Sequence, residues 1–251
     1  MNIIKLFNYP ITDEPIETLL EEFAAWIPKR EPHHVVTFNP EKLMLARRNG
    51  AFARAIKSAD LLIDDSAGLQ WAAKKSGQVI KHRVTGVDLT EALLKRAALL
   101  HWRVALVGGL GTVAAGAASI WQKRYKGLDI VCATGGLRIE CHPELNRGVL
   151  KLEEELAKEL HSLRPDILLV AMPDPKQELF ISSHKTKLRI PVMMAVGGTF
   201  DFAVGIQKRA PLSIRKAGLE WLWRLLREPR RIKRQWRLLQ FVWLVLTTRR
   251  P

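Results

Sequence analysis

Six short runs of apolar, β-prone residues alternate with longer helical patterns along this chain, and no other feature limits its fold as strongly. Within the runs, apolar residues follow one another and do not alternate with polar ones, which indicates strands that are covered on both faces. Strands of this kind form mostly parallel sheets between two layers of helices. We therefore predict an α/β fold, with a Rossmann-like, mostly parallel sheet sandwiched by helices. The expected strands are 35–37, 61–63, 103–107, 129–132, 166–170 and 191–196.

Polar residues and glycines follow most of these runs. In parallel sheets, ligands bind beyond the carboxyl ends of the strands, where the loops meet helix N-termini. These residues are therefore the candidates for a functional site. In chain order they are Thr37, Asn39, Asp64, Asp65, residues 108–111, residues 174–177 and residues 197–201.

Positive charge is concentrated at the end of the chain. The formal net charge is +15, and residues 207–251 hold 13 Lys and Arg against 2 Asp and Glu, a local charge of +11. Such a segment suits nucleic acid, anionic lipid or a phosphorylated substrate, and charge alone does not choose among them. We expect residues 1–206 to form the Rossmann-like domain and residues 207–251 to form a basic, Trp-rich helical appendage.

Cysteine content and hydropathy indicate the compartment. Cys132 and Cys141 make neither a disulfide framework nor a zinc motif, so a reducing cytoplasm is expected. The N-terminus lacks the pattern of a signal peptide. The longest apolar stretch, 238–246, is well short of the ~20 residues that a spanning helix needs. We expect a cytoplasmic protein that does not cross a membrane by itself.

Seven short blocks follow one another along nearly the whole chain: TFNP at 37–40, ADLLIDD at 59–65, RVTGVD at 83–88, PKQE at 175–178, GGTFDF at 197–202, RAP at 209–211 and LEW at 219–221. Together these blocks resemble the WecG/TagA/CpsF glycosyltransferase family, and several blocks in order are far more specific than one. The resemblance implies an inverting transferase that moves a sugar from a UDP-sugar to a polyprenyl-diphosphate-linked sugar, in cell-wall or surface polysaccharide synthesis.

The resemblance also implies a cellular location and a donor substrate. Family members act at the cytoplasmic face of the membrane, so we expect a peripheral protein on the inner face of the plasma membrane. The best-known donor of the family is UDP-N-acetylmannosamine, and UDP-hexose is the alternative. Ser66 stands where the family usually carries glycine, and Pro173 stands near another such position. These differences concern the sugar pocket, so the choice between the two donors stays open.

An inverting transferase needs a base, usually a carboxylate, that takes the proton of the acceptor hydroxyl. Asp65 follows the apolar run 61–63, which places it at the ligand edge of the sheet, and it matches the family's proposed catalytic base. Asp64 precedes it, and one of these two adjacent carboxylates also fits a helix-capping role. The resemblance favours Asp65 as the base, and the choice between the two stays open.

The departing UDP needs its negative charge balanced. The chain has no Asp-x-Asp triplet, which often holds a metal in nucleotide-sugar transferases, so we expect no metal and no other cofactor. The resemblance implies that Arg83 acts on the donor phosphates, the alternative being a solvated loop charge. It also places Gln177 in the active site, against a sugar hydroxyl. Thr37 and Asn39 fit orientation of donor or acceptor, and equally helix capping.

Two glycine-containing turns are further candidates for nucleotide binding. Gly108, Gly109 and Gly111 allow backbone N–H groups to approach a phosphate closely. An NAD site would also require an acidic residue at the end of the next strand. Asp129 stands at the start of that strand, which argues against NAD. The other turn contains Gly198 and Asp201, which fit closure over nucleotide or acceptor and equally a structural turn.

The appendage carries an apolar stripe as well as cations. A helical projection aligns Ile232, Trp236, Leu239, Trp243 and Leu246, with Arg and Lys on the other faces. This pattern is typical of a helix that lies on an anionic membrane surface, although packing on the domain or in a homo-oligomer also fits it. A nonenzymatic protein that binds membrane or nucleic acid is the alternative function, and the stripe argues against nucleic acid. The residues expected at the acceptor diphosphate or the membrane are Arg215, Arg224, Arg227, Arg230, Arg231, Trp236 and Trp243.

Overall fold

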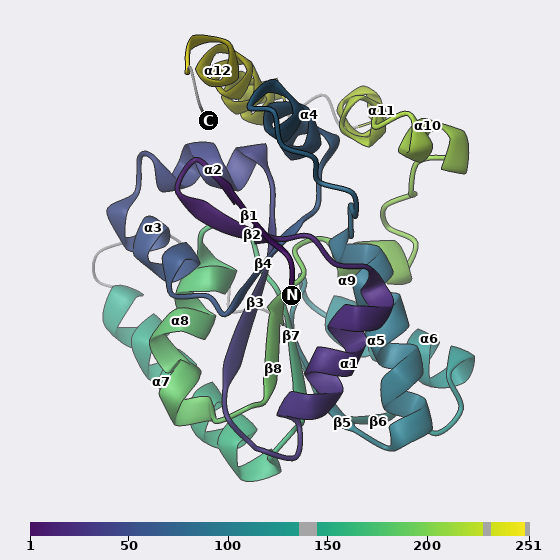
Figure 1. Ribbon diagram of the computed structural model, residues 1–251. Helices are drawn as coiled ribbons and strands as arrows, with labels where there is room; N and C mark the ends of the chain where they lie inside the picture. The colour runs from purple at the N-terminus through teal and green to yellow at the C-terminus, as the bar shows by residue number, and fades with distance from the viewer. Residues whose placement is uncertain (136–144, 228–231, 249–251) are drawn as a thin grey trace.

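The computed structural model describes the backbone of residues 1–135, 145–227 and 232–248, and every side chain in these ranges except those of residues 145–153, 216, 224 and 232–235. In this part of the chain eight strands form one sheet, in the order β1-β2-β4-β3-β8-β7-β5-β6 (Figure 1). All neighbouring strands run parallel except β1 and β2. The predicted α/β fold is confirmed. The strands are β1 (Ile3–Leu6), β2 (Tyr9–Thr12), β3 (His33–Phe38), β4 (Leu61–Asp64), β5 (Arg103–Gly108), β6 (Asp129–Thr134), β7 (Ile167–Ala171) and β8 (Val192–Ala195).

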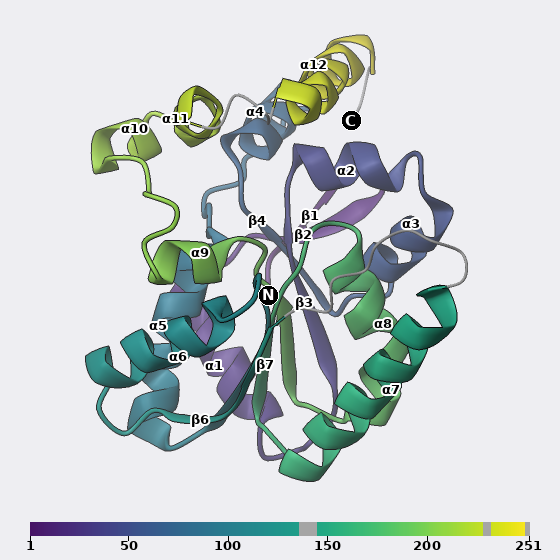
Figure 2. The ribbon, with the colours of Figure 1, turned by 180° about the vertical axis from the view of Figure 1, so that it is seen from behind.

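Helices cover both faces of this sheet, as Figures 1 and 2 show from opposite sides. Helices α1, α5, α6 and α9 form one layer, and α2, α3, α7 and α8 form the other. Helices α4, α10, α11 and α12 lie at the end of the molecule near α2. The helices are α1 (Ile16–Trp26), α2 (Pro40–Ala46), α3 (Gly50–Lys57), α4 (Ala67–Lys75), α5 (Gly86–Leu100), α6 (Val113–Arg124), α7 (Leu145–Leu163), α8 (Lys176–Leu188), α9 (Thr199–Ala203), α10 (Leu212–Lys216), α11 (Glu220–Arg227) and α12 (Ile232–Thr247).

The two helical layers explain why apolar residues follow one another in the central strands. Successive side chains of a strand point to opposite faces of the sheet. Val35 and Met194 belong to the core under α1 and α5, whereas Val36 and Met193 belong to the cores on the other face. All four are fully buried. Because water does not reach either face at these positions, apolar side chains occupy both faces of the central strands.

The N-terminal hairpin of β1 and β2 adds to the six predicted strands. Phe7 and Asn8 connect the two strands with φ values of 50° and 65°. Two consecutive residues at positive φ match the twist of a tight hairpin turn. Lys5 interrupts β1 and Pro10 interrupts β2, so neither strand forms a continuous apolar run.

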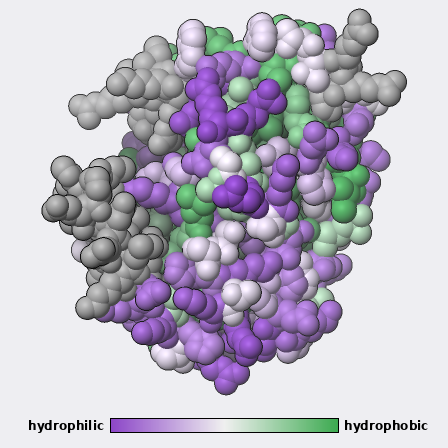
Figure 3. All heavy atoms as spheres, turned by 90° about the vertical axis from the view of Figure 1, so that its left-hand side faces the viewer, coloured by the Kyte–Doolittle hydropathy of each residue, from purple (hydrophilic) through white to green (hydrophobic). Residues whose placement is uncertain are grey.

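The last helix, α12, has two apolar faces. One face packs on α2, and its residues Phe241, Leu244 and Val245 share a core with Phe38 and Leu43. The other face is exposed. Hydrophobic residues reach the surface at this end of the molecule (Figure 3). The exposed residues of this face are Trp236, Leu239, Val242, Trp243 and Leu246.

The predicted stripe is the exposed face of α12, apart from Ile232, whose side chain lies outside the described residues. The helix therefore both packs on the domain and presents apolar side chains outward. The division into residues 1–206 and 207–251 remains a prediction.

Candidate active site

A cleft of about 660 Å³ lies at the carboxyl edge of the sheet. Its lining comes from the ends of β3, β4, β5, β7 and β8 and from the helices that follow them. Parallel strands bring their carboxyl ends to the same edge, so segments far apart in the sequence converge here. The predicted site residues that line the cleft are Thr37, Asn39, Asp65, Gly109, Gln177, Gly198 and Asp201.

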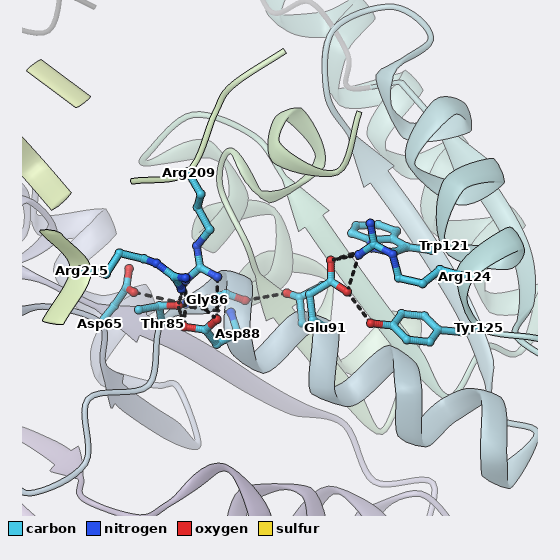
Figure 4. A network of polar contacts seen from close by, with 11 residues as sticks. Asp65, Thr85, Gly86, Asp88, Glu91, Trp121, Arg124, Tyr125, Arg209 and Arg215 are labelled. Atoms are coloured by element: carbon cyan, nitrogen blue, oxygen red, sulfur yellow. Dashed lines mark hydrogen bonds and ion pairs between the residues drawn. The ribbon is translucent and has the colours of Figure 1, made fainter. Parts of the chain in front are cut away.

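The consecutive aspartates Asp64 and Asp65 occupy different environments. Asp65 follows β4, lines the cleft and accepts a hydrogen bond from the backbone N–H of Gly86 at 3.2 Å (Figure 4). Its own N–H donates to the carbonyl of Phe38 at 3.0 Å, which fixes the backbone at the end of β3. The carboxylate that reaches the cleft is therefore that of Asp65.

Asp64 is the last residue of β4 and has no exposed surface. Burial raises its pKa to about 8, well above the ordinary 3.8, because a charged carboxylate is poorly solvated there. One oxygen accepts from the N–H of Ser66 at 2.8 Å, and Oδ2 has no hydrogen bond within the described structure. The side-chain cap of α4 comes from Ser66, which accepts from the N–H of Leu69 at 3.2 Å.

Thr37 and Asn39 both lie at the end of β3 and line the cleft. The Thr37 hydroxyl is 3.5 Å from the carbonyl oxygen of Ala195. Asn39 caps α2, with its side-chain oxygen accepting from the N–H of Lys42 at 3.0 Å. The predicted capping role of Asn39 is confirmed. Its predicted role in substrate orientation remains a prediction, as does that of Thr37.

Gln177 joins the loop after β7 to the turn after β8. Its side-chain oxygen accepts from the backbone N–H of Gly197 at 3.0 Å and faces that of Met172 at 3.4 Å. Its NH₂ group donates to Asp174 Oδ1 and Glu178 Oε1, each at 2.9 Å. The amide therefore has a partner for each of its donors and acceptors, and it holds two walls of the cleft together.

Lys42 is a buried cation beside the cleft that sequence reasoning missed. Its Nζ pairs with Glu178 Oε1 and lies 3.7 Å from Asp174 Oδ1, although only 3% of the residue is exposed. Burial lowers the pKa of Lys42, and the negative charges of Asp174 and Glu178 outweigh that effect and raise it. A lysine three positions after the Asn39 cap is an ordinary surface pattern, so only the tertiary structure, which brings Lys42 to Glu178 of α8, reveals this pair.

The glycine turn after β5 serves the packing of the strands. Gly108 has a φ of 115°, and a Cβ at this position would lie 2.2 Å from the carbonyl oxygen of Ala171. The N–H of Gly109 donates to the same oxygen at 2.8 Å, so this group already has a partner. Gly111 also has a positive φ, of 59°, with open space around it. Phosphate binding by this turn remains a prediction, and Gly109 is the member that lines the cleft.

Arg83 and Arg215 connect the core to the start of the C-terminal segment. The guanidinium of Arg83 donates to the carbonyl of Arg215 at 2.7 Å. Among the described residues, Arg83 is not part of the cleft lining, although its charge lowers the pKa of Asp64 against the larger effect of burial. Its predicted action on donor phosphates remains a prediction.

Arg209 binds the N-terminus of α5, as Figure 4 shows. Its two terminal nitrogens donate to the two oxygens of Asp88 at 2.6 and 2.8 Å, and one also donates to Thr85 Oγ1 at 3.0 Å. Arg215 lies 3.9 Å from the same carboxylate. Bidentate pairing has a defined geometry, so it fixes where the C-terminal segment leaves the domain. Burial by itself would raise the pKa of Asp88. The hydrogen bonds from Arg209 and Thr85, together with the positive charges of Arg209 and Arg215, outweigh it and lower this pKa below its ordinary value.

The remaining candidates divide between the cleft and the surface. Gly198 and Asp201 lie at the cleft in the turn and helix after β8. Arg227 is exposed and its guanidinium lies 4.8 Å from the ring centroid of Trp223. The predicted Arg230 and Arg231, and the side chain of Arg224, lie outside the described residues. Within the described ranges, no group of three or more His, Cys, Asp or Glu residues has the arrangement of a metal site.

Three residues of the C-terminal helices complete the cleft. Trp221 of α11 and Leu238 of α12 line it together with Glu220. Trp221 is 44% exposed, so one apolar side chain borders both the cleft and the surface. Trp221 therefore connects the cleft with the surface of the molecule.

Comparison with known proteins agrees with this geometry. The pattern of the glycosyl transferase WecG/TagA/CpsF family matches residues 4–251. Two similar proteins, from Staphylococcus aureus strains MW2 and MRSA252, are each 32% identical over 200 residues, which cover 80% of this chain and 74% of the relative. Both carry the name N-acetylglucosaminyldiphosphoundecaprenol N-acetyl-beta-D-mannosaminyltransferase. The predicted resemblance is confirmed, and the chain belongs to the WecG/TagA/CpsF family of glycosyltransferases.

Proposed function

We propose that this glycosyltransferase moves N-acetylmannosamine from UDP to a sugar that is carried on a polyprenyl diphosphate, with inversion and without a metal. The name of the Staphylococcus aureus relatives supports the sugar and the acceptor. The observation that carries the proposal is the carboxylate of Asp65, held at the cleft by the Gly86 N–H and reached from an apolar rim. Membership of an enzyme family sets aside the nonenzymatic alternative.

In the proposed reaction, Asp65 accepts the proton of the acceptor hydroxyl while the hydroxyl oxygen attacks the anomeric carbon of the donor sugar. The bond between that carbon and the UDP oxygen breaks, and UDP leaves with the electron pair from the opposite face. The new glycosidic bond therefore has the inverted configuration. We propose that Arg83 and the N-terminus of α6, which follows the Gly109 turn, balance the charge of the departing diphosphate.

The same proposal places the protein on the inner face of the plasma membrane. The outward side chains of α12 are large and apolar: Trp236 is 63% exposed and Trp243 is 68% exposed. Cations of the basic appendage would add attraction to anionic headgroups. A lipid-linked acceptor held in the bilayer would then meet the cleft at the rim formed by Trp221 and Leu238. None of the described helices is long and apolar enough to span a bilayer.

The test is release of UDP from a panel of UDP-sugars in the presence of a synthetic polyprenyl-diphosphate-GlcNAc acceptor and EDTA. We expect turnover with UDP-N-acetylmannosamine that requires the acceptor. If the enzyme turns over only a UDP-hexose, the donor is that hexose and not N-acetylmannosamine. If turnover stops in EDTA and returns when a divalent cation is added, the reaction requires a metal.

The variant Asp65→Asn tests the base in the same assay. An amide cannot take the proton, so we expect kcat to fall by roughly 10²- to 10⁴-fold. Asp64→Asn is the matched control, because it changes the neighbouring carboxylate that does not line the cleft. A larger loss in Asp64→Asn than in Asp65→Asn would reverse the assignment of the base.

A further inference from the structure

We propose that Asp174 recognises a hydroxyl group of the sugar ligand in the cleft, and that Lys42 is the residue that positions it. The inference rests on the proposed function, because it takes a UDP-sugar as the ligand. Asp174 lies in the loop between β7 and α8 and lines the cleft. Its side chain is 21% exposed, so it is partly buried and still open to a ligand.

One oxygen of Asp174 is held by the protein and the other is not. Oδ1 accepts from Gln177 Nε2 at 2.9 Å and lies 3.7 Å from Lys42 Nζ. Oδ2 makes no hydrogen bond to any residue in the described part of the chain. A carboxylate oxygen has acceptor capacity and no proton to give, so Oδ2 offers a site for an O–H or N–H donor.

The network behind Asp174 leaves its carboxylate little freedom. The Gln177 amide oxygen faces two backbone N–H groups, so its NH₂ group must point toward Asp174 and Glu178. Lys42 pairs with Glu178, whose side chain is fully buried. Both partners of Oδ1 are thus fixed by contacts of their own. A binding group supported in this way is preorganised, which is the condition for discriminating between similar ligands.

The chemistry of the site selects the ligand group. A carboxylate repels the phosphates of a nucleotide, whereas it accepts a charge-assisted hydrogen bond from a hydroxyl. Hydroxyl donors of a UDP-sugar are found on the transferred sugar and on the ribose. Asp65 and Asp174 line the same cleft, and the negative charges of both raise the pKa of Lys42. Asp174 is therefore near the reacting end of the cleft.

The primary test compares wild type with Asp174→Asn on donors that lack single hydroxyl groups. The amide oxygen of the variant still accepts from Gln177, and the negative charge is lost. We expect kcat/KM for the complete donor to fall by roughly 10- to 100-fold, mainly through KM. For the deoxy donor that lacks the recognised hydroxyl, wild type and variant should be equal. A loss of the same size on every analogue would overturn the proposal.

Binding measurements separate the two sources of the hydroxyl. Calorimetry with UDP, 2′-deoxy-UDP and 3′-deoxy-UDP tests the ribose, and the deoxy-sugar donors test the transferred sugar. If wild type turns over no donor, the proposed function fails, and calorimetry with intact and deoxy UDP-sugars still decides about Asp174. Equal affinities of wild type and Asp174→Asn for all of these ligands would then contradict its role.

Lys42→Met tests the positioning role. We expect it to lose discrimination between the intact and the deoxy donor, as Asp174→Asn does, and Lys42→Arg to restore part of it. A structural defect alone would lower turnover of every analogue equally and leave discrimination intact, which would count against positioning. Glu154→Gln is the control, because Glu154 is an exposed partner of Lys187 at 3.8 Å, outside the cleft lining. If Lys42→Met does not fold, Asp174→Asn decides the proposal.

Discussion

At the scale of single residues, burial distinguishes side chains that look alike in the sequence. Asp64 and Asp65 are adjacent carboxylates. Asp64 is fully buried at the end of β4, whereas Asp65 lines the cleft. His33 and His34 differ in the same way, because His33 is partly exposed and His34 is buried. Burial, followed by the positive charges of Lys42 and Lys185, lowers the pKa of His34 to about 3, so its ring is neutral in the folded protein.

The raised pKa of Asp64 predicts a pH-dependent stability. Between its ordinary pKa of 3.8 and the folded value of about 8, the folded protein binds a proton that the unfolded chain has released. Asp64 therefore contributes stability below pH 4, and this contribution is lost as the pH rises through 8. Asp64→Asn should become more stable relative to wild type by up to about 1.4 kcal/mol per pH unit in this window.

Urea unfolding of both proteins at pH 5, 7 and 9 measures this difference. Asp60→Asn serves as a comparison, since Asp60 is a partly exposed partner of Lys185. A difference between wild type and Asp64→Asn that stays constant over the three pH values would show that Asp64 is ionised throughout.

At the scale of elements, the turn between β5 and α6 shows how one glycine is required by packing and another is not. A Cβ on Gly108 would meet the backbone oxygen of Ala171 on the neighbouring strand β7, whereas a Cβ on Gly111 would meet nothing within 4 Å. Both residues have positive φ. Gly108 is therefore required both by packing and by its backbone conformation, and Gly111 by its backbone conformation alone.

Gly108→Ala and Gly111→Ala should destabilise the protein to different degrees. Gly111→Ala brings only the strain of a positive φ, about 1 kcal/mol. Gly108→Ala brings the same strain and a clash with backbone, so we expect a loss of more than about 3 kcal/mol or failure to fold. Thermal unfolding of both variants is the measurement. Equal losses would mean that β5 and β7 move apart readily at this point.

At the scale of the whole molecule, α12 joins the core to the exterior. Its inner face completes a core with β3 and α2, and Arg237 pairs with Glu41 of α2 at 3.2 Å. Its outer face carries tryptophans and leucines that no described residue covers. Helix α12 can therefore contact a bilayer while it stays docked beside the cleft.

Substitutions on the two faces of α12 should have opposite effects. Replacing Trp236, Trp243 and Leu246 by glutamine should reduce binding to vesicles that contain anionic lipid, with little change in unfolding temperature, because these side chains already face solvent. Phe241→Ala should cost about 3 to 5 kcal/mol of stability, because Phe241 is fully buried. Vesicle flotation and thermal unfolding measure the two effects. Unchanged flotation of the triple variant would contradict the membrane-facing role.

Binding to duplex DNA, measured on wild type and on the triple variant of α12, tests for a nucleic-acid partner. We expect only weak binding to duplex DNA, which comes from the net positive charge and disappears as the salt concentration rises. Tight DNA binding that the triple variant retains, together with absent vesicle binding, would revive the nucleic-acid alternative.

The sequence alone determined the class of fold and most of the sheet edge where the site lies. Continuous apolar runs record burial on both faces of a parallel sheet, and such a sheet brings residues like Thr37, Asp65 and Gln177 to one edge whatever the details of packing. The family blocks then identified the reaction class.

Only the tertiary structure decided how those residues differ from one another. It buried Asp64 and left Asp65 at the cleft, joined Lys42 to Glu178, and set Gly108 against Ala171. It also turned one apolar face of α12 inward and the other outward. Each of these outcomes depends on the direction of a side chain and on a contact between distant segments. Local patterns carry no information about either, because burial and pairing are properties of the packed molecule.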